Sequence, residues 1–212
     1  MVRRTKAEAL VTRGQILDAA ELCFRTLGVS GTSMGRIAQQ AGCTRGAIYW
    51  HFKKTAEVLR AVVARGQLHL LDELEPIACQ PSGLLTALRA VLERNLRCIQ
   101  SDPHVRSTLE IMVYRCDYAG DWQELLERHL LEMDRLEQQL RRILERADAL
   151  GELRPRICCA TAAALIASTF VGALRRYLMR PHTQRHGAEP AAVIAMALDD
   201  IAMPQPLPGS RP

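Results

Sequence analysis

Apolar residues recur at intervals of three and four along most of the chain, which is the spacing of helices that bury one face. The first such segment is predicted at residues 6–27, and Gly28 supplies its C-terminal stop. Its apolar positions are Ile16, Ala20, Cys23, Phe24 and Leu27. Two short helices are predicted next, at residues 34–41 and 45–52, with a break between them at residues 42–44. The chain therefore opens with three helices.

Proline, glycine and capping residues divide the remainder into further helices. One is predicted to open at Lys54 or Thr55 and to run to Pro76, another lies at residues 84–99, and a third begins at Pro103 after the capping residue Asp102. A long periodic stretch opens at residues 120–121 and reaches Leu150. Its apolar stripe is wider than two positions per heptad, which favours a packed bundle over a coiled-coil seam. No segment alternates apolar and polar residues for the length of a strand, so the prediction is an all-α protein.

Residues 157–174 contain no charge, and eighteen residues are the lower limit for a membrane-spanning helix. Small residues dilute this segment, and a lone span with no second apolar segment makes a poor membrane protein. Small side chains four residues apart instead predict a ridge for a closely packed partner helix, made of Ala160, Ala164, Ser168 and Gly172. A second small-residue helix at residues 191–203 carries Ile194, Ala197, Leu198 and Ile201 on one face. Doubled by symmetry, these two helices predict a homodimer interface.

Charge is distributed unevenly along the 212 residues. The whole chain has 28 basic and 23 acidic side chains. Residues 1–65 hold 11 of the basic and 4 of the acidic ones, which leaves 17 and 19 for residues 66–212. The basic surplus therefore lies in the N-terminal third, as is typical of a module that binds nucleic acid or an anionic membrane.

The seven cysteines show neither a C-x-x-C spacing nor an even number, so they predict neither a zinc site nor a disulfide framework. The basic N-terminus is followed by no apolar core, so no signal peptide is predicted. Free thiols without a secretion signal indicate a cytoplasmic protein.

Residues 34–52 form a short predicted helix, a tight turn through Gly42 and a second short helix, which is the pattern of a helix-turn-helix. In the second helix, Ile48 and Phe52 lie four residues apart and are predicted to pack on Phe24 and Ile37. The opposite face carries Arg45 and Tyr49, also four apart. A helix that is apolar inward and cationic outward suits the major groove of DNA.

Each outward residue has a physical role on DNA. Thr44 caps the helix and can meet a phosphate, and Arg45 can pair with guanine or with a phosphate. Gly46 allows a close approach, and Tyr49 can pack on a thymine methyl group. His51 and Lys54 are predicted phosphate contacts. For Trp50, a purely structural role at the edge of the module is an equal alternative.

Residues 32–38 (TSMGRIA) and 41–53 (AGCTRGAIYWHFK) resemble the DNA-binding domain of TetR-type transcriptional repressors. Residues 3–20 fit the same pattern, and the similarity continues through residues 111–118 to the end of the chain. It is strongest for the AcrR-like branch, whose members repress multidrug-efflux operons.

The resemblance implies a homodimer of subunits with about nine helices. It implies a DNA-binding domain at residues 1–54 and a ligand-binding and dimerisation domain at residues 55–212. By position, the DNA-contact role falls to Thr44, Arg45, Gly46, Tyr49, Trp50, His51 and Lys54, with Thr32 and Ser33 on phosphates. The small-residue helices described above fall where the family has its dimer interface.

The effector pocket is the least specific part of this prediction. The resemblance places Val63 and Gln67 at the pocket wall, and Glu110, Tyr114 and Phe170 are further candidates because they are polar or aromatic within apolar faces. Ordinary core and surface roles are at least as consistent for each of the five. A mixed apolar pocket with one or two acids suits lipophilic, cationic or planar compounds.

The predicted function is a ligand-responsive repressor of a multidrug-efflux operon that binds a palindromic DNA operator as a dimer and is released by a small compound. The alternative is a repressor that senses oxidants through Cys43, in the turn before the recognition helix. No Gly-rich phosphate loop, nucleophile motif or metal-ligand motif is present in the sequence, so neither an enzyme nor a metal or organic cofactor is predicted. A DNA-architectural or membrane-surface protein would leave the large neutral-to-acidic bundle unexplained.

Overall fold

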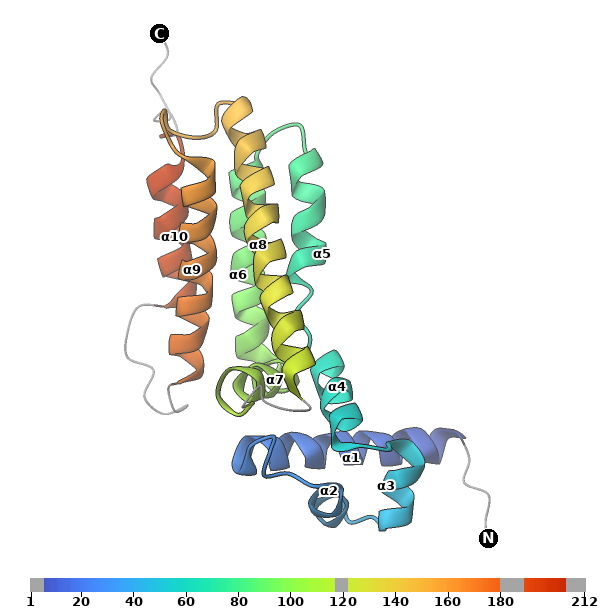
Figure 1. The fold of residues 1–212 in the computed structure, drawn as a ribbon. Helices are drawn as coiled ribbons and strands as arrows, with labels where there is room; N and C mark the ends of the chain where they lie inside the picture. Colours follow the sequence, from blue (N-terminus) through green and yellow to red (C-terminus); the bar gives the residue numbers. More distant parts are fainter. Residues whose placement is uncertain (1–5, 117–121, 180–188, 205–212) are drawn as a thin grey trace. The chain divides into compact units, whose positions relative to one another are not determined.

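The computed structural model describes residues 6–116, 122–179 and 189–204. They form ten α-helices and one short 3₁₀ helix (Figure 1). The helices are α1 (Lys6–Leu27), α2 (Met34–Gln40), α3 (Arg45–His51), α4 (Thr55–Arg65), α5 (Leu70–Leu74), η1 (Glu75–Cys79), α6 (Leu84–Ser101), α7 (Pro103–Tyr114), α8 (Gln123–Ala149), α9 (Cys159–Leu178) and α10 (Pro190–Ile201). The all-α prediction is confirmed for the described residues. Residues 117–121, where the long helix was expected to open, lie outside them.

The chain folds into two compact units. The first unit holds the described residues up to Leu68 and those from Ser101 to Arg128, so it combines α1–α4 with α7 and the start of α8. The second unit holds residues from His69 to Gln100 and those from His129 onward. The predicted division of roles at residue 54 stays a prediction, because these units are defined by packing and not by function.

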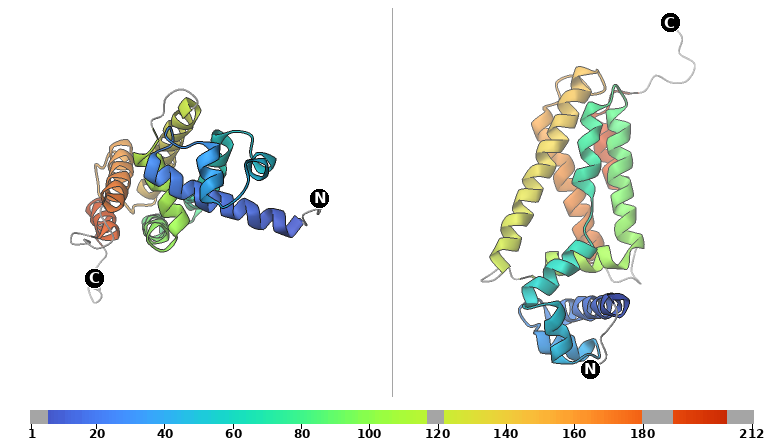
Figure 2. Two further views of the ribbon diagram at one scale, coloured as in Figure 1. Left: turned by 90° about the horizontal axis from the view of Figure 1, so that it is seen from below. Right: turned by 90° about the vertical axis from the view of Figure 1, so that its right-hand side faces the viewer.

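The second unit is a bundle of long helices. Its α6, α9 and the larger part of α8 run alongside one another, and α10 packs against α9 (Figures 1 and 2). Glu152, just after α8, accepts hydrogen bonds from the backbone N–H groups of Gly83, Leu84 and Leu85 at 2.6–3.1 Å. A carboxylate at the start of α6 satisfies N–H groups that a helix cannot pair internally.

The helix predicted from residue 55 to Pro76 is broken in two. After α4 ends at Arg65, residues 67–69 are not helical and the chain resumes as α5. Gly66 lies so close to α7 that an added Cβ would clash with Thr108 Oγ1 and stand 2.5 Å from the His104 carbonyl oxygen. Tertiary packing therefore ends the helix at a point where the apolar periodicity continues.

Capping predictions agree with the structure at α7. The Asp102 carboxylate accepts hydrogen bonds from the backbone N–H groups of His104 (2.8 Å) and Val105 (3.3 Å), and Pro103 occupies the first turn. This is the arrangement in which a missing proline N–H costs nothing.

Among the described helices, none is long and apolar enough to cross a membrane. Residues 159–174 of the uncharged segment lie in α9, and residues 157–158 precede that helix. Its predicted ridge faces outward: Ala160, Ser168 and Gly172 are exposed and Ala164 is half-buried. An added Cβ at Gly172 would meet nothing within 4 Å. The ridge is therefore open for a partner helix.

The predicted partner face of α10 is only partly available. Ile194, Leu198 and Ile201 are at most 3% exposed because they are already buried within their own chain. Ala197 is half-buried, and Met196 is 72% exposed on the outer side of the helix. Three of the four apolar positions therefore hold α10 within the protomer and offer no surface to a second copy.

Candidate nucleic-acid interface

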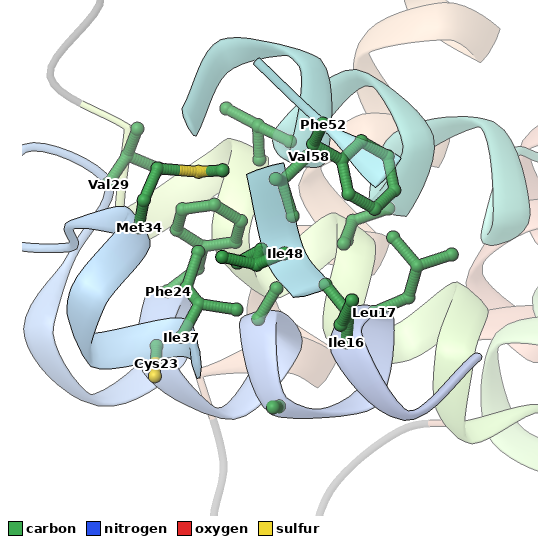
Figure 3. Packing of buried hydrophobic residues seen from close by; sticks show 14 of the residues in the cluster. Ile16, Leu17, Cys23, Phe24, Val29, Met34, Ile37, Ile48, Phe52 and Val58 are labelled. Carbon is green, nitrogen blue, oxygen red and sulfur yellow. The ribbon is translucent and has the colours of Figure 1, made fainter. Parts of the chain in front are cut away.

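The candidate interface is built on the core of the first unit, in which α1, α2, α3 and α4 share one apolar cluster. Phe24, Ile37 and Ile48 have no exposed surface, and Phe52 is also buried, as the sequence predicted. Figure 3 shows these four side chains converging with Val58 of α4. Full burial of such a side chain contributes roughly 1.5–3 kcal/mol, so this cluster fixes the orientation of the short helix α3.

Local backbone features shape the turn between α2 and α3. Ser33 is the N-cap of α2 and its hydroxyl oxygen accepts from the Arg36 N–H at 3.4 Å. Gly42 has a φ of 63°, a left-handed conformation that residues with a Cβ rarely adopt. Thr44 caps α3 by accepting from the Ala47 N–H at 3.2 Å. These caps and the glycine turn the chain sharply enough for two short helices to pack together.

The face of α3 opposite Ile48 is turned to solvent. Tyr49 is 47% exposed, and Trp50 is 69% exposed although tryptophan is highly buried on average. Thr44, Arg45 and Gly46 are exposed and His51 is half-buried. The Trp50 and His51 rings meet edge to face with centroids 4.6 Å apart. Six of the predicted contact residues therefore lie together along and just before one helix.

The basic side chains around α3 differ in how they are held. The Arg45 guanidinium lies over α2, because an added Cβ at Gly35 would stand 3.6 Å from its Nη2 atom. Lys53 is folded back, since its ammonium donates to the Tyr49 carbonyl oxygen at 2.9 Å. Lys54 is the exposed N-cap residue of α4. The positive charge therefore extends from the start of α2 to the start of α4.

Two residues change the predicted set. Thr32 is only 7% exposed, and its hydroxyl donates to the Gly28 carbonyl oxygen at 2.7 Å, so in this conformation it braces the turn instead of facing outward. Arg13 of α1, which the sequence reasoning did not include, places its guanidinium 5.3 Å from the centre of the Phe52 ring. A cation over an aromatic face is a favourable contact, and it brings one more positive charge beside α3.

The five predicted effector residues are not gathered in one unit. Val63, Gln67, Glu110 and Tyr114 belong to the first unit and Phe170 to the second. Val63 packs against the apolar cluster of the first unit, and Glu110 forms an ion pair with Arg25 at 2.9 Å. An open cavity of about 560 Å³ between α1 and α2 has none of the five in its lining, which is Leu22, Cys23, Thr26, Leu27, Arg36, Gln39 and Gln40.

The described residues contain no group of three or more histidine, cysteine or acidic side chains that could hold a metal ion. What they do present is a helix-turn-helix with a buried inner face and an exposed, aromatic and cationic outer face. This defines the class: a DNA-binding regulator, in which a rigid core presents one helix to the major groove.

The comparisons with known proteins identify the family. Residues 16–62 match the family model of bacterial regulatory proteins of the tetR family, and residues 83–202 match the C-terminal region of MAATS-type transcriptional repressors. The chain belongs to the tetR family, a non-enzymatic family of transcriptional regulators, and its C-terminal part is of the MAATS type.

Several relatives match this chain over nearly their whole length. The chain is 33% identical over 204 residues to the HTH-type transcriptional regulator AcrR of Shigella flexneri, covering 94% of this chain and 93% of that protein. It is 32% identical to the regulator TtgR of Pseudomonas putida, covering 85% and 87%. A solved SmeT–triclosan complex has a TM-score of 0.75 at 33% identity and covers 93% and 99% of the two chains. SmeT is the repressor of the Stenotrophomonas maltophilia multidrug efflux pump SmeDEF, so the chain is homologous to an efflux-pump repressor.

Proposed function

We propose that this protein is a homodimeric repressor that binds a palindromic operator and controls a multidrug-efflux operon. The observation that carries the proposal is the exposed outer face of α3, where Tyr49 and Trp50 stand out from a helix whose inner face is fully buried. Membership of the tetR family supports DNA binding. The kind of operon is supported by a solved structure at 32% identity, that of SmeT, the repressor of the Stenotrophomonas maltophilia multidrug efflux pump SmeDEF.

Two copies are needed to read a palindrome. The open ridge of α9, at Ala160, Ser168 and Gly172, supports a close helix contact between copies. In the dimer the two α3 helices lie about 34 Å apart, one turn of DNA, in successive major grooves. Arg45, which rests on α2, and Lys54 then contact phosphates, while Tyr49 reaches a base edge.

The effector is proposed to be a small lipophilic or cationic compound. The solved complex of SmeT with triclosan, a small lipophilic molecule, supports the lipophilic class. Binding shifts the protein toward a state with lower operator affinity, for which a difference of a few kcal/mol between states is enough. The oxidant-sensing alternative through Cys43 has less support, because that side chain is partly buried against the core of the first unit.

The experiment is a binding assay with the purified protein and the DNA upstream of its own and neighbouring genes. We expect selective binding, compared with shuffled DNA of equal length, that weakens between 50 and 200 mM salt by about 10³-fold for six phosphate contacts. Triclosan, ethidium and tetraphenylphosphonium are added separately, and at least one is expected to release the DNA. Equal binding to shuffled DNA would contradict the operator proposal, and release by none of them would contradict the effector class.

A further inference from the structure

One buried carboxylate in the first unit has no part in the DNA interface. Glu21 lies on the inner face of α1 with its side chain 9% exposed. Burying a carboxylate is costly unless partners compensate the charge, so its partners indicate what it does. Its two partners come from helices distant in the sequence.

The first partner is Arg65, the last residue of α4. Its Nε donates to Glu21 Oε1 at 3.1 Å, and its Nη2 donates to the same oxygen. Its Nη1 also donates to Asp18 Oδ1 at 2.7 Å. Burial alone would lower the pKa of Arg65, but the hydrogen bonds to Glu21 and Asp18 outweigh it and raise the pKa above its ordinary value. The end of α4 is therefore fastened to α1 by a charge-assisted fork.

The second partner is His104, in the first turn of α7. Its Nδ1 lies 3.1 Å from Glu21 Oε2 and 3.2 Å from Oε1. The neighbouring backbone is packed just as closely, since Gly66 leaves no room for a Cβ against Thr108 and the His104 carbonyl oxygen. The Thr108 hydroxyl donates to the Val62 carbonyl oxygen at 3.3 Å. The end of α4, the start of α7 and the middle of α1 thus form one joint, which we call the Glu21 joint (Glu21, Arg65 and His104).

The Glu21 joint lies next to two of the points where the chain passes between the two compact units. The chain passes from one compact unit to the other at three points: after Leu68, before Ser101 and after Arg128. Arg65 stands three residues before the first point, and His104 stands three residues after the second. Two of the three chain connections between the units therefore have, within three residues, a side chain in hydrogen-bond contact with the Glu21 carboxylate: Arg65 at the first and His104 at the second.

We propose that Glu21 is a positioning residue for effector control of DNA binding: it ties both entering segments to α1, so that a displacement of either one moves α1. Because α1 packs on α2, and α2 on α3, a shift of α1 is passed to the recognition helix. The inference rests on the proposed function, since it concerns how an effector lowers operator affinity. Packed side chains and ion-pair networks of this kind are one physical route by which two distant sites can be coupled.

The test uses the full-length dimer and three variants. Glu21→Gln keeps the size of the side chain and removes its charge, and His104→Gln removes the α7 arm alone. Arg60→Gln is the matched control, because it breaks an ion pair of α4 with Glu124 of α8 that involves neither α1 nor α7. For each protein, operator affinity is measured with and without triclosan and ethidium, compound binding is measured by calorimetry, and folding is checked by thermal melting.

We expect wild type and Arg60→Gln to lose operator affinity on compound binding by about 5–150-fold, the usual range of allosteric coupling. Glu21→Gln should still bind the operator and the compound, but its loss should fall to less than about 2-fold, with His104→Gln between the two. An equal loss of operator affinity on compound binding in all four proteins would overturn the proposed role of Glu21 and leave the proposed function intact. Loss of operator binding by folded Glu21→Gln without any compound would also overturn it, by indicating a purely structural role. If neither compound releases even the wild-type protein, the proposed effector class fails, and this inference fails with it.

Discussion

Replacing Gly66 by alanine tests the close approach that ends α4. The added Cβ would lie 2.5 Å from the His104 carbonyl oxygen, about 0.9 Å inside the 3.4 Å at which ordinary van der Waals contact begins. Overpacking of this kind costs roughly 1–3 kcal/mol. Loss of glycine flexibility in the unfolded chain returns about 0.4–1 kcal/mol, so the net destabilisation is expected to be about 1–2 kcal/mol. For a chain of this length, that lowers the melting temperature by roughly 2–8 °C.

The assay is thermal unfolding followed by circular dichroism at one fixed protein concentration, because a dimer melts at a concentration-dependent temperature. Gly14→Ala is the matched control, since Gly14 lies within α1 of the same unit and an added Cβ would meet nothing within 4 Å. That variant should gain about 0.5–1 kcal/mol from better helix propensity. A Gly66→Ala protein that melts at or above the wild-type temperature would refute the reasoning about this contact.

Three further predictions concern the core, a cap and the thiols. Ile48→Ala should destabilise the protein by about 2–5 kcal/mol in denaturant unfolding, because the side chain is fully buried; a loss under 1 kcal/mol would contradict its role in fixing α3. Asp102→Ala should cost about 1 kcal/mol by removing the cap of α7, whereas an unchanged midpoint would mean that this cap contributes nothing. Iodoacetamide at pH 7.5 should alkylate Cys158 faster than Cys23. Cys158 is exposed, and hydrogen bonds from the side chain and backbone N–H of Thr161 lower its pKa, which increases the thiolate fraction. Burial raises the pKa of the Cys23 thiol. Mass spectrometry follows the labelling, and faster alkylation of Cys23 would contradict the prediction.

Much of the first unit could be predicted from the sequence because its signals are local. Thr44 and Asp102 are capping residues that precede apolar periodicity, and each caps the helix that follows. The buried face of α3 also follows from spacing, since Ile48 and Phe52 are four residues apart. Local hydrogen bonding and helical period are properties of a few neighbouring residues, which a sequence displays directly.

Other features depend on contacts between distant segments, and the sequence did not reveal them. The break at Gly66 comes from α7, some forty residues later in the chain. Periodicity identified Ile194 as apolar but could not say whether its own chain or a second copy would cover it. The burial of Glu21 could have been predicted from the sequence. It lies four residues after Leu17 and three before Phe24, so it falls on the buried stripe of α1. A carboxylate at such a position needs a partner of opposite charge.

The central claim is that the outer face of α3 reads operator DNA, and the most direct measurement compares Tyr49→Ala with wild type on the upstream DNA. Tyr49 is half exposed, so its removal should leave the melting temperature unchanged. Losing one base contact in each subunit at about 1–3 kcal/mol should weaken operator binding by roughly 30-fold to 10⁴-fold for the dimer. Leu131→Ala, an exposed site on α8, is the control and should bind like wild type. Undiminished operator binding by folded Tyr49→Ala would contradict the account.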